Sequence, residues 1–338
     1  MGRAMHEMNL TLGLRANEWV EVKSLSEILA TLDGGSKCEG LPFMPEMARH
    51  CGKQYRVFKR ADKTCDNING RWMLRRMYDT VLLESLRCDG DAHGGCQAGC
   101  MLFWKEAWLK RVKCKTDMTE LVSVNRLIVQ DVDCQSDRGH GSGQLLKATR
   151  VADSADGKGD CEVYRCQGTE LHKATYPISR WDFLQYVRDL ASCNVDVGEF
   201  IRGIAIALFN GVQRIRGAMT FPYVEGSLKA TPKTACDLQA GELVRIKPLD
   251  DIVATLDVRN RNRGLLFDLE MANFCGGTFR IKKRVEKIIN ERTGEMIRLP
   301  NDCLILEGVS CVSQVHSDRL FCPRRIYAYW RGSWLERA

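Results

Sequence analysis

The sequence lacks the features that would assign it quickly to a well-known functional class. No apolar run approaches the roughly 18–20 residues that span a bilayer, and the opening MGRAMHEMNLTLGLRANEW has no apolar signal-peptide core. We therefore expect a cytoplasmic chain without a membrane partner. There is also no P-loop, no GxGxxG after a strand, no GxSxG elbow and no HExxH. The common nucleotide-binding, hydrolase and zinc-protease motifs are thus excluded.

Cysteine, by contrast, is abundant, with sixteen in 338 residues. A reducing compartment disfavours structural disulfides, and a chain of this length can bury a core without them. Metal ligation is therefore the favoured interpretation of these cysteines. Buried thiols that pack as small apolar groups, and disulfides, remain the alternatives.

The charge of the chain is only mildly positive, with a formal net value of +7. Basic residues gather in RVFKRADK, RWMLRRM, RNRNRG and RIKKRVEK, but no strongly basic tail is present. Such runs usually form solvated faces of strands and loops. We therefore expect a small molecule or a redox partner protein as the partner, with nucleic acid as a less favoured alternative.

The most specific signal is an internal repeat. EWVEVKSLSEILATLD (18–33) and ELVRIKPLDDIVATLD (242–257) share nine of sixteen residues at an offset of 224. At the same offset, GLPFMPEMARHCGKQYRV and GLLFDLEMANFCGGTFRI share nine of eighteen. Both copies end in a Trp-x3-Trp-Leu pattern, WKEAWL and WRGSWL. We therefore expect one unit of about 95 residues to occur twice.

The repeat divides the chain into an arm (1–17), a first unit (18–112), a middle region (113–241) and a second unit (242–338). Alternating segments such as VEVKSL and VRIKPL, YRVFKR and FRIKKR, and VLLESL and LILEGV predict short strands in both units. Asn69-Gly70 and Thr293-Gly294 predict hairpin turns. The expected fold is mainly β, with two tandem small barrels separated by a mixed α+β region that contains two helices.

Each unit resembles SH3-like barrels of the kind found in nitrile hydratase beta subunits and in KOW or Tudor modules. The resemblance rests on a polar-V-x-V strand, a divergent loop, Gly-x-x-Phe-x-x-x-Met and Gly-x-x-aromatic-Arg-Val, over about sixty residues of each unit. It implies a fold and carries no catalytic residue across.

The middle region predicts short strands, then turns at SDRGHGSG and DSADGKGD, and then two helices. SRWDFLQYVRDLAS has the apolar spacing of an amphipathic helix capped by Ser179. Asp196 opens a second, more apolar helix, VGEFIRGIAIALFNGVQRI.

The repeat also pairs the cysteines. Three cysteines of each unit correspond: Cys51 with Cys275 at the start of a strand, Cys88 with Cys311 at the end of another, and Cys96 with Cys322 in the loop that follows. Cysteines at these places can meet at one rim of a barrel. We expect one metal site in each unit, with the ligand sets Cys51, Cys88, Cys96 and Cys100, and Cys275, Cys303, Cys311 and Cys322. Tetrahedral thiolate sites suit Zn²⁺ or iron–sulfur clusters such as 4Fe-4S. The long, glycine-flanked intervals slightly favour a cluster.

Two further expectations concern residues around these sets. Cys161, Cys166, His172 and Cys193 form a candidate third site in the middle region, with incidental thiols as the alternative. His93 is a candidate ligand or proton donor, or else a solvated loop residue.

The carboxylates repeated in both units, including Glu46 and Glu270, favour a role in holding a loop through backbone N–H groups, with a catalytic role as the alternative. The function predicted is a cysteine-ligated metalloprotein with a redox or metal-assisted role. The alternative is a tandem SH3-like binding module with structural zinc.

Overall fold

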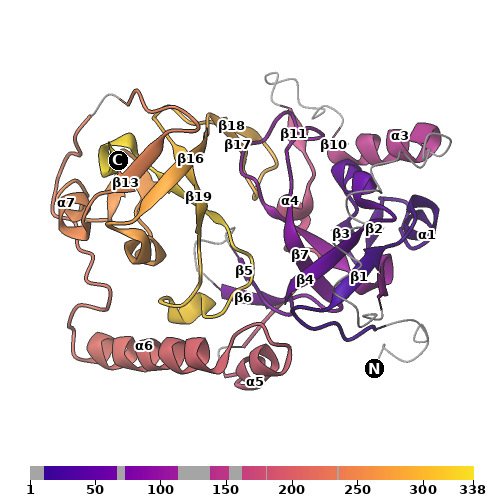
Figure 1. The fold of residues 1–338 in the computed structure, drawn as a ribbon, viewed down its shortest axis with the longest axis horizontal. Coiled ribbons are helices and arrows are strands. Elements are labelled where there is room, and N and C mark those ends of the chain that lie inside the picture. Colours follow the sequence, from indigo (N-terminus) through magenta and orange to yellow (C-terminus); the bar gives the residue numbers. More distant parts are fainter. Residues whose placement is uncertain (1–10, 67–72, 113–137, 152–161, 180, 234–235) are drawn as a thin grey trace, which may run out of the picture.

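The computed structural model describes residues 11–66, 73–112, 138–151, 162–179, 181–233 and 236–338. The fold is mainly β and contains two curled five-stranded sheets, one from each predicted unit (Figure 1). The first sheet has the order β8-β7-β4-β1-β9 and the second β20-β19-β16-β13-β21. Their strands are β1 (Trp19–Val22), β4 (Gln54–Arg60), β7 (Thr80–Arg87), β8 (Met101–Lys105) and β9 (Leu109–Arg111), and β13 (Leu243–Ile246), β16 (Thr278–Arg284), β19 (Leu304–Ser310), β20 (Tyr327–Trp330) and β21 (Leu335–Arg337).

The two sheets agree in register as well as in order. Trp19 pairs with Arg56 in the first sheet, and Leu243 pairs with Arg280 in the second. Both sheets have an irregularity after the buried residue of the long strand, Val57 or Ile281. Each unit therefore has an equivalent strand at each of these positions.

The smaller elements of the two units also correspond. In the first unit they are α1 (Leu25–Leu29), β2 (Lys37–Cys38), β3 (Leu41–Pro42), η1 (Pro45–His50), β5 (Thr64–Asp66), β6 (Met73–Arg76) and η2 (Glu106–Trp108). In the second they are α7 (Leu249–Val253), β14 (Arg261–Asn262), β15 (Leu265–Leu266), η3 (Leu269–Phe274), β17 (Lys287–Ile289), β18 (Met296–Arg298) and η5 (Gly332–Trp334), with η4 (Ser317–Arg319) in addition. The ILATLD segment begins within α1, which Ser24 caps with Glu27 in a capping box.

Each unit has its own apolar core. Trp104 and Trp108 are fully buried in the first, and Trp330 and Trp334 in the second. The first tryptophan of each pair lies in a strand, as its last residue (Trp330) or its last but one (Trp104), and the second lies in a 3₁₀ turn. The pair therefore packs inward without forming one helical face. Aromatic rings of this size supply much of the buried apolar area of so small a core.

The middle region packs along both units (Figure 1). Its elements are α3 (Arg138–Thr149), β10 (Arg150–Val151), β11 (Val163–Tyr164), α4 (Gln167–Glu170), β12 (Tyr176–Pro177), α5 (Leu184–Ala191) and α6 (Val197–Ile215). The glycine-rich SDRGHGSG segment, expected as a turn, contributes to α3, so that expectation was wrong. β12 extends the β5–β6 hairpin of the first unit.

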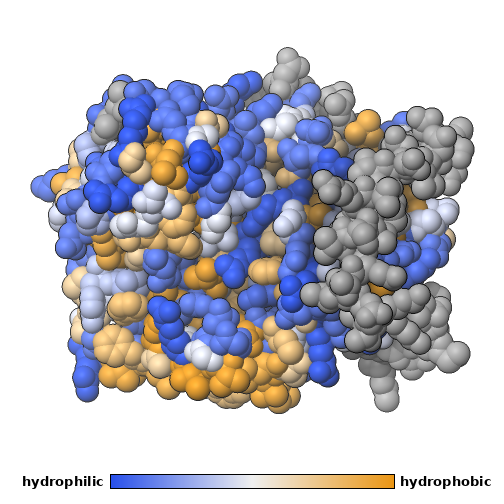
Figure 2. All heavy atoms as spheres, in the orientation of Figure 1, coloured by the Kyte–Doolittle hydropathy of each residue, from blue (hydrophilic) through white to orange (hydrophobic). Residues whose placement is uncertain are grey.

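The two predicted helices are present with different starts. Asp196 caps α6 by accepting a hydrogen bond from the Glu199 backbone N–H at 2.8 Å, as predicted. Ser179 instead accepts from the Trp181 backbone N–H at 3.3 Å in a tight turn, and α5 begins only at Leu184. Figure 2 shows apolar residues gathered along the edge formed by α5 and α6.

Each unit contributes a hairpin that packs against the cysteine loop of the other unit, an arrangement that we call the hairpin exchange. The backbone N–H of Cys65 in β5 donates to Cys322 Sγ of the second unit at 3.2 Å. At the equivalent place, the backbone N–H of Ile289 in β17 donates to Cys96 Sγ of the first unit at 3.3 Å. Position 289 is position 65 plus the repeat offset of 224. Each unit thus covers the cysteine loop of the other.

Candidate metal centre

Three different ligand atoms converge in the first unit. Cys88 follows the end of β7, Glu46 lies in η1, and His93 lies in the loop between β7 and β8. Cys88 Sγ is 3.1 Å from Glu46 Oε1 and 4.0 Å from His93 Nδ1, and the last two atoms are 3.7 Å apart. Both Glu46 and His93 are buried. Among the described residues, these three form the one group whose ligand atoms all lie within 4.8 Å of one another.

The spacing of these atoms fits a single ion. Zn–S, Zn–N and Zn–O bonds of about 2.3, 2.05 and 2.1 Å in a tetrahedron place the ligand atoms about 3.4–3.6 Å apart. The observed separations of 3.1–4.0 Å lie on both sides of that range. In addition, the buried Glu46 Oε2 has no hydrogen-bond partner among the described residues. A buried polar atom of this kind calls for a partner.

Two glycines shape the loop that carries His93. Gly90 has φ +84°, and a Cβ there would lie 1.9 Å from the Cys96 carbonyl oxygen. The Gly90 carbonyl accepts hydrogen bonds from the backbone N–H groups of His93 and Gly95, both at 2.9 Å. Gly94 has φ +60°, and a Cβ there would lie 2.4 Å from Tyr164 Oη. The loop thus makes a tight turn against the Tyr164 side chain of the middle region, at positions that only glycine fits, and His93 within this turn is buried.

Four thiols line one small cavity beside this group: Cys88, Cys96, Cys100 and Cys166. The cavity has a volume of about 40 Å³, which is room for about three water molecules. Cys166 is the N-cap residue of α4 in the middle region. Ile289 and Arg324 of the second unit complete the lining. All three parts of the chain therefore build this cavity.

Burial dominates the protonation of these thiols. It raises the pKa of Cys100 to about 12 and that of Cys166 to about 11, and nearby Glu291 adds to both shifts. Burial, followed by the Glu46 carboxylate, holds the pKa of Cys88 far above its usual value. Burial likewise lowers the pKa of His93, against the opposing effect of Glu46. The cavity therefore favours neutral thiols and a neutral imidazole, and a metal that bound there would displace thiol protons.

The equivalent place in the second unit is built differently. The buried Glu270 carboxylate accepts three backbone hydrogen bonds, from Gln314 at 3.1 Å, Val315 at 2.8 Å and His316 at 3.3 Å. This is the loop-holding role predicted for the repeated carboxylates. No backbone bond of this kind to Glu46 is seen among the described residues, where its carboxylate faces Cys88 and His93 instead. The repeated glutamates therefore have different partners.

A larger cavity of about 230 Å³ lies in the second unit. Cys311 and Cys322 line it together with Cys65, which comes from the β5 strand of the first unit. Arg319, beside them, pairs with Asp268. Three thiols thus meet here, although they do not belong to one unit.

The remaining predicted ligands lie apart from these two groups. Cys51 and Cys275 occupy equivalent C-cap positions after η1 and η3, half-buried against the core of their own unit. Cys303 packs with Val285 and Tyr327 in a separate apolar cluster. None of these three is part of the cavity linings described above.

The candidate third site is divided in the structure. Cys166 lines the cavity of the first unit, and Cys193 is exposed after α5. His172 is exposed, with its carbonyl accepting a hydrogen bond from Arg75 at 3.1 Å. Cys161 lies outside the described residues.

The spacing of the cysteines predicts a separate site for Cys166 and does not indicate that Cys65 meets cysteines of the second unit. The equivalence of positions 65 and 289 was present in the repeat, but a hairpin exchange leaves no local signal. The spacing of cysteines therefore could not reveal either contact.

Comparison with family models, curated proteins and solved structures finds no match. The thirteen cysteines in the described ranges form no disulfide. Among the described helices, none combines the length and apolarity needed to cross a bilayer.

Proposed function

We propose that the chain is a metalloprotein that binds one ion, most favourably Zn²⁺, through Glu46, Cys88 and His93. The observation that carries this proposal is the convergence of their three ligand atoms within 4.8 Å in a buried place. A sulfur, a nitrogen and an oxygen donor together suit Zn²⁺ better than an iron–sulfur cluster, which takes thiolates. Cys100 and Cys166 line the adjoining cavity and are candidates for the fourth ligand.

The enclosed position favours a structural ion over one that acts on a substrate. Glu46 and His93 are buried, and the adjoining cavity holds only about 40 Å³. A substrate-binding ion needs an open coordination position that solvent or substrate can reach. When bound, Zn²⁺ would supply a tetrahedral link between η1 and the loop after β7. Glu46, Cys88 and His93 would each donate one ligand atom to the ion.

An iron–sulfur cluster is the second candidate, because four thiols line one cavity. The ligands of a cluster bind different iron atoms and therefore lie farther apart than those of a single ion. A redox role would follow from a cluster and not from zinc.

We further propose that the two units are SH3-like barrels related by duplication, and that the protein works in the cytoplasm. The matched strand orders and registers support the first point. Its many thiols, none of which forms a disulfide in the described ranges, support the second.

The test is elemental analysis and a visible spectrum of protein purified without oxygen. We expect about one zinc per chain and a colourless protein, with zinc lost in Cys88→Ser and in His93→Asn. Cys311→Ser is the matched control, since it changes the equivalent thiol of the second unit, and it should keep its zinc. A brown protein with iron and sulfide would favour the cluster. The absence of any metal, or zinc unaffected by both variants, would exclude this site.

A further inference from the structure

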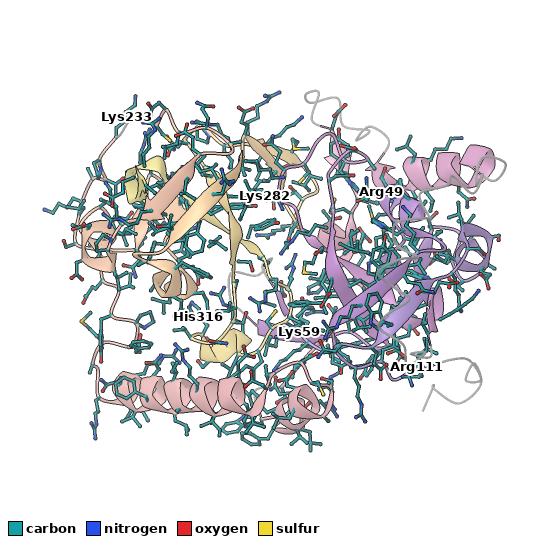
Figure 3. All side chains as sticks on the ribbon, in the orientation of Figure 1. Arg49, Lys59, Arg111, Lys233, Lys282 and His316 are labelled. Carbon is teal, nitrogen blue, oxygen red and sulfur yellow. The ribbon has the colours of Figure 1, made fainter. Side chains whose placement is uncertain are left out.

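Five cationic side chains gather where the two units face each other. Lys59 and Arg87 come from β4 and β7 of the first unit, and Lys282, Lys283 and Arg325 come from β16 and the segment before β20 of the second. We call these five the inter-unit cation cluster. Figure 3 shows Lys59 and Lys282 in the central part of the molecule, whereas Lys233 lies at its outer edge.

The cluster is organised around two aromatic rings. The Arg87 guanidinium lies 4.0 Å from the ring centre of Tyr327, and Lys282 Nζ donates to Tyr327 Oη at 2.7 Å. The Arg325 guanidinium lies 5.5 Å from the ring centre of Phe58. Cation–π contacts of this kind attract cations to the rings and leave their N–H donors available at the edges.

Carboxylates do not neutralise this charge. Over the described ranges, no ion pair within 4.0 Å joins any of the five to an aspartate or a glutamate. Arg87 instead donates to the carbonyl oxygens of Gly99 at 2.8 Å and Arg325 at 3.0 Å. The remaining N–H donors of the cluster therefore have no anionic partner in this part of the protein.

The cations also act on one another. Burial lowers the pKa of Lys59, and the Arg325 charge lowers it further, while Glu199, Asp189 and Cys322 oppose the shift. Asp189 is itself paired with Lys63 at 2.5 Å. Burial, and then Lys282, lower the pKa of Lys283. Like charges held together and partly buried destabilise a protein unless an anion binds among them.

We propose that the inter-unit cation cluster binds a ligand that carries several phosphate groups. Phosphate oxygens accept hydrogen bonds from lysine and from the fork of arginine, and several adjacent phosphates match several adjacent cations. Arg325 also lines the 230 Å³ cavity, whose other lining is largely apolar and includes Phe274 and Tyr329. An uncharged part of the ligand, such as a base, has a place there. The proposal does not depend on the metal centre, because the two use different residues.

Two sources of closely spaced phosphates are distinguished by the probes. One is a labelled single-stranded RNA of about 12 nucleotides, followed by fluorescence anisotropy. The other is inorganic tripolyphosphate, followed by calorimetry. Both are measured with the full chain at about 50 mM salt and again at higher salt. Binding of RNA alone identifies a nucleic acid strand, and binding of tripolyphosphate identifies a small polyphosphate ligand; either result supports the proposal.

The variants are the double change Lys282→Gln and Lys283→Gln and, separately, Arg325→Gln. For RNA, losing two phosphate contacts lowers affinity on the order of 10–100-fold and makes the slope of log K against log salt less steep by about 1.4. The control is Lys229→Gln with Lys233→Gln, which removes two exposed lysines elsewhere and should leave affinity unchanged. Circular dichroism checks folding, and Arg325→Gln serves if the double variant does not fold. No binding of either probe, or binding unchanged in the folded cluster variants, would overturn the proposal.

Discussion

The two repeated glutamates allow a matched experiment. Glu46→Gln and Glu270→Gln make the same chemical change at equivalent positions, and both conserve side-chain volume. Glu270 accepts three backbone hydrogen bonds, two on Oε1 and one on Oε2. The glutamine would keep one oxygen and would place an NH₂ donor against a backbone N–H. Glu46 loses no backbone bond seen in the described chain, and its Oε2 has no hydrogen-bond partner there.

These differences set the expected magnitudes. A hydrogen bond to a charged group is worth about 1.5–3 kcal/mol, and leaving a buried donor without a partner costs a similar amount. Glu270→Gln should therefore lower the free energy of unfolding by about 2–4 kcal/mol. Glu46→Gln should change it by less than about 1 kcal/mol in metal-free protein. Urea unfolding with a chelator present measures both, with the midpoint compared at constant slope.

The gain in stability on adding zinc should rank the two variants in the opposite order: Glu270→Gln, the less stable variant without metal, should gain more than Glu46→Gln. An ion at about 100 times its dissociation constant stabilises the folded chain by about 2.7 kcal/mol, and tenfold weaker binding halves that gain. Glu270→Gln should gain the full amount, and Glu46→Gln about half or less. Equal losses of stability in metal-free protein would show that Glu46 is structural, and equal gains with zinc would remove it from the ligand set.

Two other predictions concern buried charge. His50 lies 2.6 Å from Tyr55 Oη, and burial, then Arg49, lower its pKa to about 4. The unfolded chain therefore binds this proton more readily, so the His50 contribution to stability is complete above about pH 6.5 and is lost as pH falls through 4. His50→Gln should flatten urea midpoints between pH 7 and 4, and an NMR titration of His50 near pH 6.5 would contradict this. Lys63→Met leaves the buried Asp189 unpaired and should lower the free energy of unfolding by about 3–5 kcal/mol, measured by urea unfolding. Adding Asp189→Leu should recover most of this loss. An equal loss in the single and the double variant would argue against the ion pair.

Much of the local structure could be predicted from the sequence. Strand alternation in VEVKSL and YRVFKR, the turn at Thr293-Gly294 and the Asp196 cap all depend on residues close in the chain. All four repeated tryptophans are fully buried, as their large apolar area favours. These features are fixed by local geometry and by the need to bury large apolar groups.

The candidate site was only partly predictable, because it depends on contacts between distant segments. Cys88, Cys96 and Cys100 do line one cavity, but Cys166 arrives from the middle region. Glu46 and Glu270 lie in the same local sequence pattern. Their partners differ because the loop that faces Glu46 brings Cys88 to it, whereas the loop that faces Glu270 offers backbone N–H groups such as that of Val315. The Asn-Gly and Thr-Gly pairs that follow β5 and β17 in the sequence likewise predict hairpins without indicating which unit each hairpin will cover.

The hairpin exchange has a consequence for the order in which the protein is made. Ile289 follows Cys96 by 193 residues in the chain, and synthesis at about 5–20 residues per second separates the two by roughly 10–40 s. During that interval the cysteine loop of the first unit has left the ribosome without the strand that will cover it. Cys65 waits longer still, since Cys322 follows it by 257 residues. The nascent chain thus passes through a period in which these thiols are open to ions, oxidants and chaperones, until the strands and loops of the second unit have been made.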